Sequence, residues 1–267
     1  DLLQISGLTH GTDVWLGNAQ DLIKAGTCTI SEVVGTRDGI MLYLIRHGLE
    51  NKLSFDIMEA VRKGRGVKPE WEEEMLKHDV PEWYIASCKK IKYMFPKAHA
   101  AAYVMSAIRL AWYKIYYPME FYAAYFTVAP GGFDGDIVMR GRGAVSATIE
   151  ELSKKPDATQ KEAETVTALS LAREALARGV VFLPVDLYKS DATAFLPENG
   201  KIRLPFAALG GLGEGAAQKI VEARADGEFF SIEELRERAK LNKSVIEILS
   251  QSGALKNLSE TNQYTFF

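Results

Sequence analysis

The residues from Lys89 to Pro118 constrain this chain most, because they join a basic turn to a long apolar stretch. Pro96 fixes the backbone of the turn and disfavours helix at the residue before it. Alanines at 100–102 favour helix, so we predict that a helix begins near Ala98. The N–H groups at a helix start carry partial positive charge, and with Lys97 and the lysines before it they favour phosphate.

Aromatic and imidazole side chains flank this predicted helix start. Tyr93 and Phe95 offer flat faces for a base, and His99 lies in the first helical turn. The ordinary alternative is that the lysines form a solvated rim and the two aromatic rings lie in the core, and composition alone favours it. The order of the residues favours the first interpretation, through the resemblance described below.

Composition and charge are ordinary for a soluble globular protein, with 47% hydrophobic and 25% charged residues among 267. The net charge of −3 gives no support to a nucleic-acid partner, so any DNA contact must come from local basic patches at 62–65, 89–97 and 140–142. Cys28 and Cys88 fit no metal-ligand spacing and indicate reduced thiols of a cytosolic protein.

The apolar run at 98–117 is about long enough to cross a bilayer, but Arg109 and Lys114 within it indicate a buried amphipathic helix instead. We expect no membrane partner. The chain starts with Asp1 and has no signal peptide, so we predict a fragment or a processed chain.

The order of residues around the predicted helix start resembles the fingers segment of bacterial C-family replicative DNA polymerases. That segment has an F-x-K-x-H-A-A-A-Y core, which here is Phe95, Lys97, His99–Ala102 and Tyr103, followed by the turn Tyr117–Phe121. Residues 5–23, ISGLTHGTDVWLGNAQDLI, resemble the entry to the fingers in the PolC-type branch. Within this stretch we assign His10 beside Asp13 to a turn rather than to an acid–base pair.

Further basic residues fit the same segment. A helix with Ile40 and Leu44 on one side follows Thr36, and Phe55, Met58 and Val61 share one side of a second helix. The second helix ends in RKGRG at 62–66, where cations and glycines let the backbone approach a polyanion. Asp134 and Asp136 are spaced like metal ligands, but the family's catalytic carboxylates lie upstream in the palm, so we do not assign them to catalysis.

The second half of the sequence predicts a connector followed by paired helical hairpins. A small β element covers 180–184 and 194–204 with an Asn199-Gly200 turn, and VDLYKSDATAF at 185–195 resembles the PolC-type connector. Residues 209–224, LGGLGEGAAQKIVEAR, resemble a helix-hairpin-helix motif, whose backbone N–H groups hold a DNA phosphate without reading sequence. A capping box at Ser231 and a helix at 241–255 indicate a second hairpin unit. An ordinary glycine-rich connection is the alternative.

The last residues resemble the sliding-clamp-binding pentapeptide of PolC-type enzymes, usually Gln-Leu-Ser-Leu-Phe. This chain keeps Gln263 and Phe267 and has Tyr264 and Phe266 where leucines are usual. We predict that these four residues bind the clamp.

Together these motifs predict a mainly α fold in four parts: a helical fingers domain, a helical connector with a small β element and the start of the duplex-binding domain, tandem helix-hairpin-helix units, and a clamp-binding tail. The predicted boundaries are 1–130, 131–205, 206–256 and 257–267. The resemblance is to the C-terminal part of a bacterial PolC-type DNA polymerase III alpha subunit, a nucleotidyltransferase that acts at the nucleoid in the cytoplasm.

The resemblance implies two binding surfaces and a set of partners. Residues for the incoming deoxynucleoside triphosphate are Arg37, Arg46, Arg62, Lys63, Arg65, Tyr93, Lys97 and His99. Residues for duplex DNA are Gly211, Gly213, Gly215 and Lys219. The partners are primer–template DNA, the triphosphate, the sliding clamp and the palm of the polymerase, whose carboxylates hold Mg²⁺ outside this chain.

The palm carboxylates are absent from this sequence, so we predict that the chain alone does not polymerise. Two alternatives remain open. One is a non-catalytic module for DNA binding and clamp tethering, with the fingers-like part as a platform. The other is a repair protein that uses only the hairpins, which leaves 1–128 unexplained.

Overall fold

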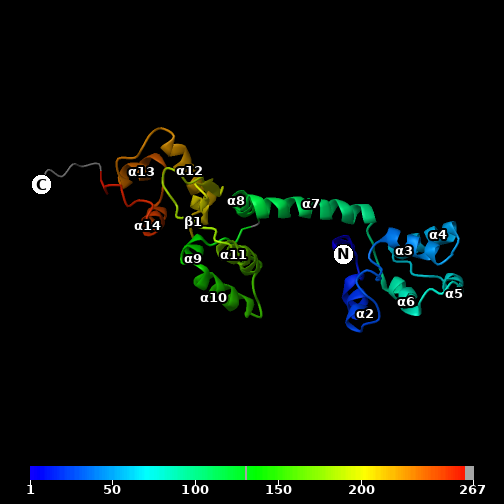
Figure 1. Ribbon diagram of the computed structural model, residues 1–267. Coiled ribbons are helices and arrows are strands. Elements are labelled where there is room, and N and C mark those ends of the chain that lie inside the picture. The colour runs from blue at the N-terminus through cyan, green and yellow to red at the C-terminus, as the bar shows by residue number, and fades with distance from the viewer. Residues whose placement is uncertain (130, 262–267) are drawn as a thin grey trace. The chain divides into compact units, whose positions relative to one another are not determined.

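The fold is mainly α, as predicted, in a computed structural model that describes residues 1–129 and 131–261. The described chain forms two compact units, 1–111 and 112–267, which are divided within helix α7 (Lys97–Tyr116). This division follows compactness, whereas the four predicted domains follow motifs, so their boundaries stay predictions. Figure 1 labels most of the helices and strand β1.

The regular secondary structure of the first unit, over its described residues, consists of helices joined by loops. Its elements are α1 (Leu2–His10), the π-type turn η1 (Trp15–Ala19), α2 (Gln20–Lys24), α3 (Arg37–Arg46), α4 (Asn51–Arg62), α5 (Pro69–Lys77), α6 (Glu82–Lys90) and the first part of α7. Local sequence sets several starts. The Thr36 hydroxyl accepts from the Gly39 amide at the start of α3, the Glu50 carboxylate caps α4, and Pro69 is the first residue of α5.

The core of this unit lies between α3, α4, α5 and α6. Ile40 and Leu44 of α3 pack with Ile57 and Val61 of α4, and all four side chains are fully buried. Phe55 was expected on the buried side of α4 but is 49% exposed, while Ile57 takes a core position. The buried residues of α4 are Ser54, Ile57, Met58 and Val61, so the predicted side is confirmed for Met58 and Val61 and wrong for Phe55.

The second unit wraps helices around a small sheet. After the end of α7 come α8 (Pro118–Val128), α9 (Gly135–Met139), α10 (Arg142–Ser153), α11 (Gln160–Ala177), β1 (Phe182–Leu183), β2 (Leu196–Glu198), β3 (Lys201–Arg203), the 3-10 turn η2 (Phe206–Ala208), α12 (Glu214–Arg224), α13 (Ile232–Arg238) and α14 (Lys243–Gln251). The sheet order is β1-β3-β2, with β1 parallel and β2 antiparallel to β3.

The turn between β2 and β3 is the predicted Asn199-Gly200 hairpin. Both residues have positive φ, 50° and 73°, as a type I′ turn requires. Tyr122 of α8, Leu169 of α11, Ile202 of β3 and Phe206 of η2 are fully buried in one cluster, which ties the sheet to the helices.

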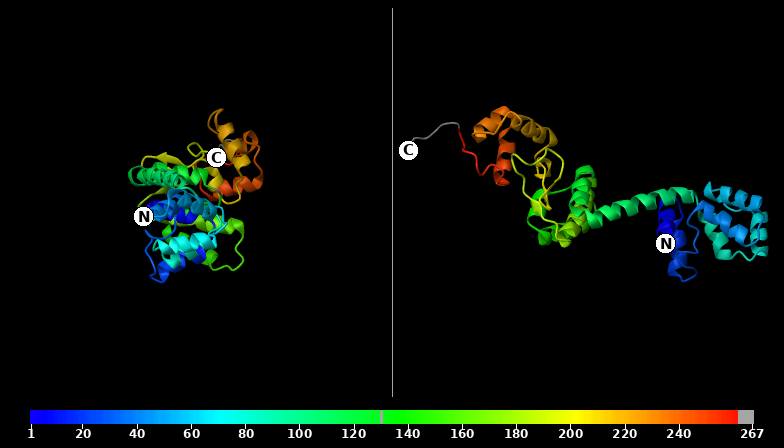
Figure 2. Two further views of the ribbon diagram at one scale, coloured as in Figure 1. Left: turned by 90° about the vertical axis from the view of Figure 1, so that its right-hand side faces the viewer. Right: turned by 45° about the horizontal axis from the view of Figure 1, so that its top comes forward.

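Helix α7 is one continuous helix of 20 residues, which the right-hand view of Figure 2 shows along its length. Its predicted burial is wrong, because only Ala100 is buried and most side chains from Tyr103 to Tyr117 are exposed. Within the first unit Ser6 contacts the carbonyl of Ala100, and within the second unit Lys114 pairs with Glu174 of α11 at 2.7 Å. Across the described residues, no helix combines the length and apolar character needed to span a membrane.

A pair of substitutions in α4 tests the observed helix phase. Ile57→Ala removes a fully buried side chain and should lower the free energy of unfolding by about 2–5 kcal/mol. Phe55→Ala on the same helix should change it by about 0.5 kcal/mol or less, because the ring is largely exposed. Urea unfolding of both variants measures the difference. Equal costs would contradict the described packing of α4.

Candidate functional site

The loop from Ile91 to Pro96 joins three helices of the first unit through backbone groups. The Arg37 amide at the start of α3 donates to the carbonyl of Phe95 at 3.3 Å. The carboxylate of Asp38 accepts from the Lys97 amide at 2.6 Å and so caps α7, which starts one residue before the predicted position. The amide of Met94 donates to the carbonyl of Arg62, the last residue of α4, at 3.2 Å. The starts of α3 and α7 and the end of α4 therefore meet.

Side-chain rings gather on this loop and on the first turns of α7. His99 stacks on Phe95 with ring centroids 4.5 Å apart, and Tyr103 lies one turn further along α7 at 4.6 Å from His99. Tyr93 meets Phe95 edge to face at 5.0 Å. We call Tyr93, Phe95, His99, Tyr103 and His10 the ring cluster.

The ring cluster faces solvent in part. Tyr93 is 43% and Tyr103 54% exposed, whereas Met94 between Tyr93 and Phe95 is fully buried. The alternative in which Tyr93 and Phe95 belong to the core is therefore wrong for Tyr93, and Phe95 is half-buried. The cluster presents flat faces that are open to a ligand.

Three predicted cations converge on Glu59 near the end of α4. Arg62 holds its carboxylate with two hydrogen bonds of 2.5 and 2.9 Å, the ammonium of Lys63 lies 2.9 Å away, and the guanidinium of Arg37 lies 3.7 Å away. Hydrogen bonds from Arg62 and then Lys63 lower the pKa of Glu59 to about 2. The local charge stays positive, because three cations face two carboxylates, Glu59 and Asp38, the second of which lies 3.9 Å from Arg37.

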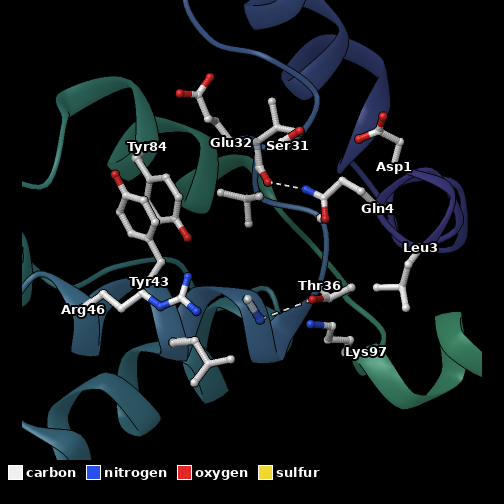
Figure 3. A pocket seen from close by; sticks show the side chains of 15 residues that line it. Asp1, Leu3, Gln4, Ser31, Glu32, Thr36, Tyr43, Arg46, Tyr84 and Lys97 are labelled. Carbon is white, nitrogen blue, oxygen red and sulfur yellow. Dashed lines mark hydrogen bonds between the residues drawn. The ribbon is translucent and has the colours of Figure 1, made fainter.

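The other predicted residues lie at two cavities of the same unit. Arg46 and Lys97 line one of about 360 Å³, where Tyr43 stacks on Tyr84 with ring centroids 4.0 Å apart (Figure 3). Arg65 and Lys63 line another of about 360 Å³, beside Trp71. The side chains of Arg46, Arg65 and Lys97 make no ion pair with any described residue, so each keeps its charge for a ligand.

Some residues of this surface were not found from the sequence. Glu59 is one, although its spacing of three and four residues from Arg62 and Lys63 is a helical ion-pair signal. His10 is the other. From the sequence we assign it to a turn, but it is the last residue of α1, and its contact with His99 is not predicted.

The predicted hairpin turn lies between η2 and α12 in the second unit. Gly211 has a φ of 85°, which favours glycine, and the Leu212 amide closes the turn onto the carbonyl of Leu209 at 3.1 Å. Helix α12 then starts at Glu214, and its N-cap residue Gly213 provides no side-chain cap. Its first backbone N–H groups and Lys219, which is exposed one turn further on, are the groups that we predict from the sequence to bind phosphate.

Two glycines of this turn are not needed by the fold. Gly213 has an ordinary φ of −73°, and a Cβ atom added at Gly213 or Gly215 would meet no described atom within 4 Å. Glycine at such positions leaves room for a ligand to approach the backbone closely. Gly210 and Gly211 border a cleft of about 420 Å³ that Lys161 also lines.

The second hairpin unit also forms. Ser231 caps α13 by accepting from the Glu234 amide at 3.1 Å, and Asn242 caps α14 by accepting from the Val245 amide at 2.9 Å. The helix predicted at 241–255 is α14, and Gly253 follows it with a φ of 80°.

Asp134, one of the two carboxylates spaced like metal ligands, has a structural role. Asp134 caps α9 by accepting from the Ile137 amide at 2.9 Å, which accounts for this residue structurally. Over the residues that the structure describes, no group of three or more His, Cys, Asp and Glu residues is arranged to hold a metal ion. The predicted clamp-binding residues Gln263, Tyr264, Phe266 and Phe267 lie outside the described residues.

Comparison with known proteins finds a finger-domain family and a helix-hairpin-helix motif in this chain. The family described as the bacterial DNA polymerase III alpha subunit finger domain matches residues 1–80, and the helix-hairpin-helix motif matches residues 179–264. The chain is 55% identical to the PolC-type DNA polymerase III of Halalkalibacterium halodurans, 53% to that of Bacillus subtilis and 52% to that of Caldanaerobacter subterraneus. Each match covers 100% of this chain and 19% of the relative, so the chain spans about a fifth of the length of these curated relatives.

The lowered pKa of Glu59 predicts how pH acts on the first unit. Its ion pairs stabilise the fold above the ordinary pKa of 4.5, and this contribution is lost as the pH falls toward about 2. Glu59→Gln should therefore be less stable than the parent at neutral pH, and the difference should shrink across that window. Urea unfolding over a pH series measures it.

Glu73→Gln is the matched control, because Glu73 is exposed on α5 and makes no ion pair with a described residue. It should leave the pH profile unchanged. A stability difference for Glu59→Gln that does not depend on pH would contradict the role of its charge.

Proposed function

Because this chain belongs over its whole length to the PolC-type DNA polymerase III family, we propose that it supplies the incoming-nucleotide-binding fingers and a sequence-independent duplex-binding part of a replicative DNA polymerase. The observation that carries the proposal is the meeting of the starts of α3 and α7 at the loop 91–96. It brings cations and aromatic rings, the two kinds of group that a nucleoside triphosphate requires, onto one surface.

The cations would bind the triphosphate. Arg37, Arg62 and Lys63 converge on a single carboxylate, so phosphate oxygens can compete for the same donors. Arg46 and Arg65 add positive charge that no described carboxylate neutralises. The ring cluster residues Tyr93 and His99, together with Lys97, would pack against the nascent base pair or its phosphates.

The α12 hairpin would bind the DNA backbone. A helix start without a side-chain cap and two glycines with open space in front of them support a phosphate contact that does not read sequence. Such binding weakens steeply with salt, because each neutralised phosphate releases counterions.

We assign no catalytic metal site to this chain. The family implies Mg²⁺ bound by palm carboxylates, and the described residues do not fit such a site. We therefore give no residue of this chain to the ion, and we expect the chain alone not to polymerise. Gln263, Tyr264, Phe266 and Phe267 are proposed to tether the polymerase to a sliding clamp.

A cytoplasmic location at the nucleoid is part of the proposal. Cys28 and Cys88 are both buried and free, and burial raises the pKa of the Cys88 thiol to about 12. Unreactive reduced thiols suit a reducing compartment.

The nucleotide assignment is tested in a complete PolC-type polymerase that carries this sequence. Arg65→Glu and His99→Ala should each raise the KM for the nucleotide about tenfold, as expected when about 1.4 kcal/mol of binding is lost. The KM for primer–template should not change. Lys24→Glu is the control, because Lys24 is an exposed cation at the end of α2 that lines neither of the two cavities and makes no ion pair with a described residue.

An unchanged nucleotide KM in both variants, with DNA binding intact, would instead favour the non-catalytic DNA-binding and clamp-tethering module. The fingers-like unit would then be a platform only.

The duplex assignment is tested by Gly213→Ala. Because alanine adopts the φ of −73° and its Cβ meets open space, the variant should fold as stably as the parent. It should bind duplex DNA at least about fivefold more weakly, since a methyl group blocks the approach of the phosphate by about 1 kcal/mol or more. Fluorescence anisotropy over a salt series measures the affinity.

Gly211→Ala is the comparison variant, because its φ of 85° makes alanine strained and should lower stability as well as binding. Unchanged DNA affinity in Gly213→Ala would show that the hairpin is only structural.

A further inference from the structure

His10 is held at the end of α1 by its own helix. Its Nδ1 atom lies 2.5 Å from the carbonyl oxygen of Ser6, one turn earlier. A carbonyl only accepts, so the imidazole donates through Nδ1, and this bond fixes the plane of the ring.

The end of α1 is in turn tied to the loop and helix that carry His99. The Thr12 amide donates to the carbonyl of Tyr93 at 2.9 Å, and the Lys92 amide donates to the carbonyl of Thr12 at 3.1 Å. Gly11 leaves no room for a side chain, because a Cβ atom there would lie 2.8 Å from the carbonyl of Tyr93. His10 is therefore placed by backbone contacts on the loop itself.

The ring of His10 packs against one side of the His99 ring. Their centroids are 5.1 Å apart with the planes at 87°, and His10 also contacts Tyr103 at 4.8 Å. Phe95 stacks on His99 from another direction at 4.5 Å. His99 thus has a stacked neighbour and an edge-on neighbour, and the edge-on one comes from a different helix.

We propose that His10 is a positioning residue, which holds the ring of His99 in the orientation that packs against the nascent base pair. The inference rests on the proposed role of His99 in nucleotide binding. Without His10, the side of His99 toward α1 is open, so the imidazole gains rotational freedom that nucleotide binding must then remove.

The chain offers a matched control in His47. Its Nδ1 atom lies 2.9 Å from the carbonyl of Tyr43, also four residues earlier, and its ring packs on Tyr43 at 4.2 Å. His47 follows the C-terminal end of α3. The contact between α3 and the loop 91–96 is made at the opposite end, by Arg37. It reproduces the local structure of His10 without the contact to His99.

The experiment measures kcat and the KM values for nucleotide and primer–template in the complete polymerase, for H10A, H10F, H47A, H99A and the double variant H10A/H99A. H10A should raise the nucleotide KM about fivefold and leave kcat and the DNA KM within about twofold of the parent. H10F keeps a ring beside His99 and should recover most of the loss. H47A should match the parent.

The double variant separates positioning from general stability. Because His10 acts through His99, H10A/H99A should be no worse than H99A alone. The inference would be overturned if the effects of H10A and H99A on the nucleotide KM were fully additive. It would also be overturned if H10A changed the nucleotide KM no more than H47A does. A raised nucleotide KM in H99A with none in H10A overturns this inference alone, whereas an unchanged KM in H99A overturns the proposed function with it. If H10A does not fold, H10L removes the ring but keeps an apolar side chain beside His99. A nucleotide KM for H10L within about twofold of that for H47A would then overturn the inference.

Discussion

The hydrogen bond from the Lys97 amide to the Asp38 carboxylate is the contact on which the proposed nucleotide-binding surface depends. It caps α7 with a residue from α3, and the neighbouring bond from the Arg37 amide to Phe95 fixes the loop against the same helix start. A helix cap is usually local, from the residue that precedes the helix. Here the cap comes from another helix, so the position of the ring cluster follows from the packing of α3 on α4 and cannot change independently of it.

The proposed function uses two different kinds of recognition, one in each unit. In the first, side chains provide the chemistry: guanidinium and ammonium groups held near one carboxylate, and rings that stack on one another. In the second, the backbone provides it, through a helix start exposed by glycines. Side chains suit a ligand whose charge and shape are specific, whereas backbone amides suit a repetitive phosphate chain. This contrast agrees with a polymerase segment that holds one nucleotide and any duplex sequence.

Features set by local chemistry could be predicted from the sequence. The start of α7 after Pro96, the Asn199-Gly200 turn and the positive φ of Gly211 depend on the backbone preferences of a few neighbouring residues. Features set by packing could not. Phe55 has the spacing of a core residue yet lies outside, because the contact with α3 determines the face of α4. The apolar length of α7 suggested burial, but within each unit only its ends are tied to other elements. The contacts of His10 with His99 and of Arg37 with Glu59 join residues far apart in the chain, which no local pattern records.

Hydrogen exchange in the complete polymerase tests the central claim most directly, because it reads the surface segment by segment. Exchange would be followed with primer–template bound, with and without the correct nucleotide. The account predicts that nucleotide slows exchange at the start of α3 and from Tyr93 to Tyr103, while α14 of the second unit stays unchanged. Unaltered exchange at both of these segments, with slowed exchange elsewhere proving that nucleotide is bound, would contradict the claim that the meeting of α3, the loop 91–96 and α7 forms the nucleotide-binding surface.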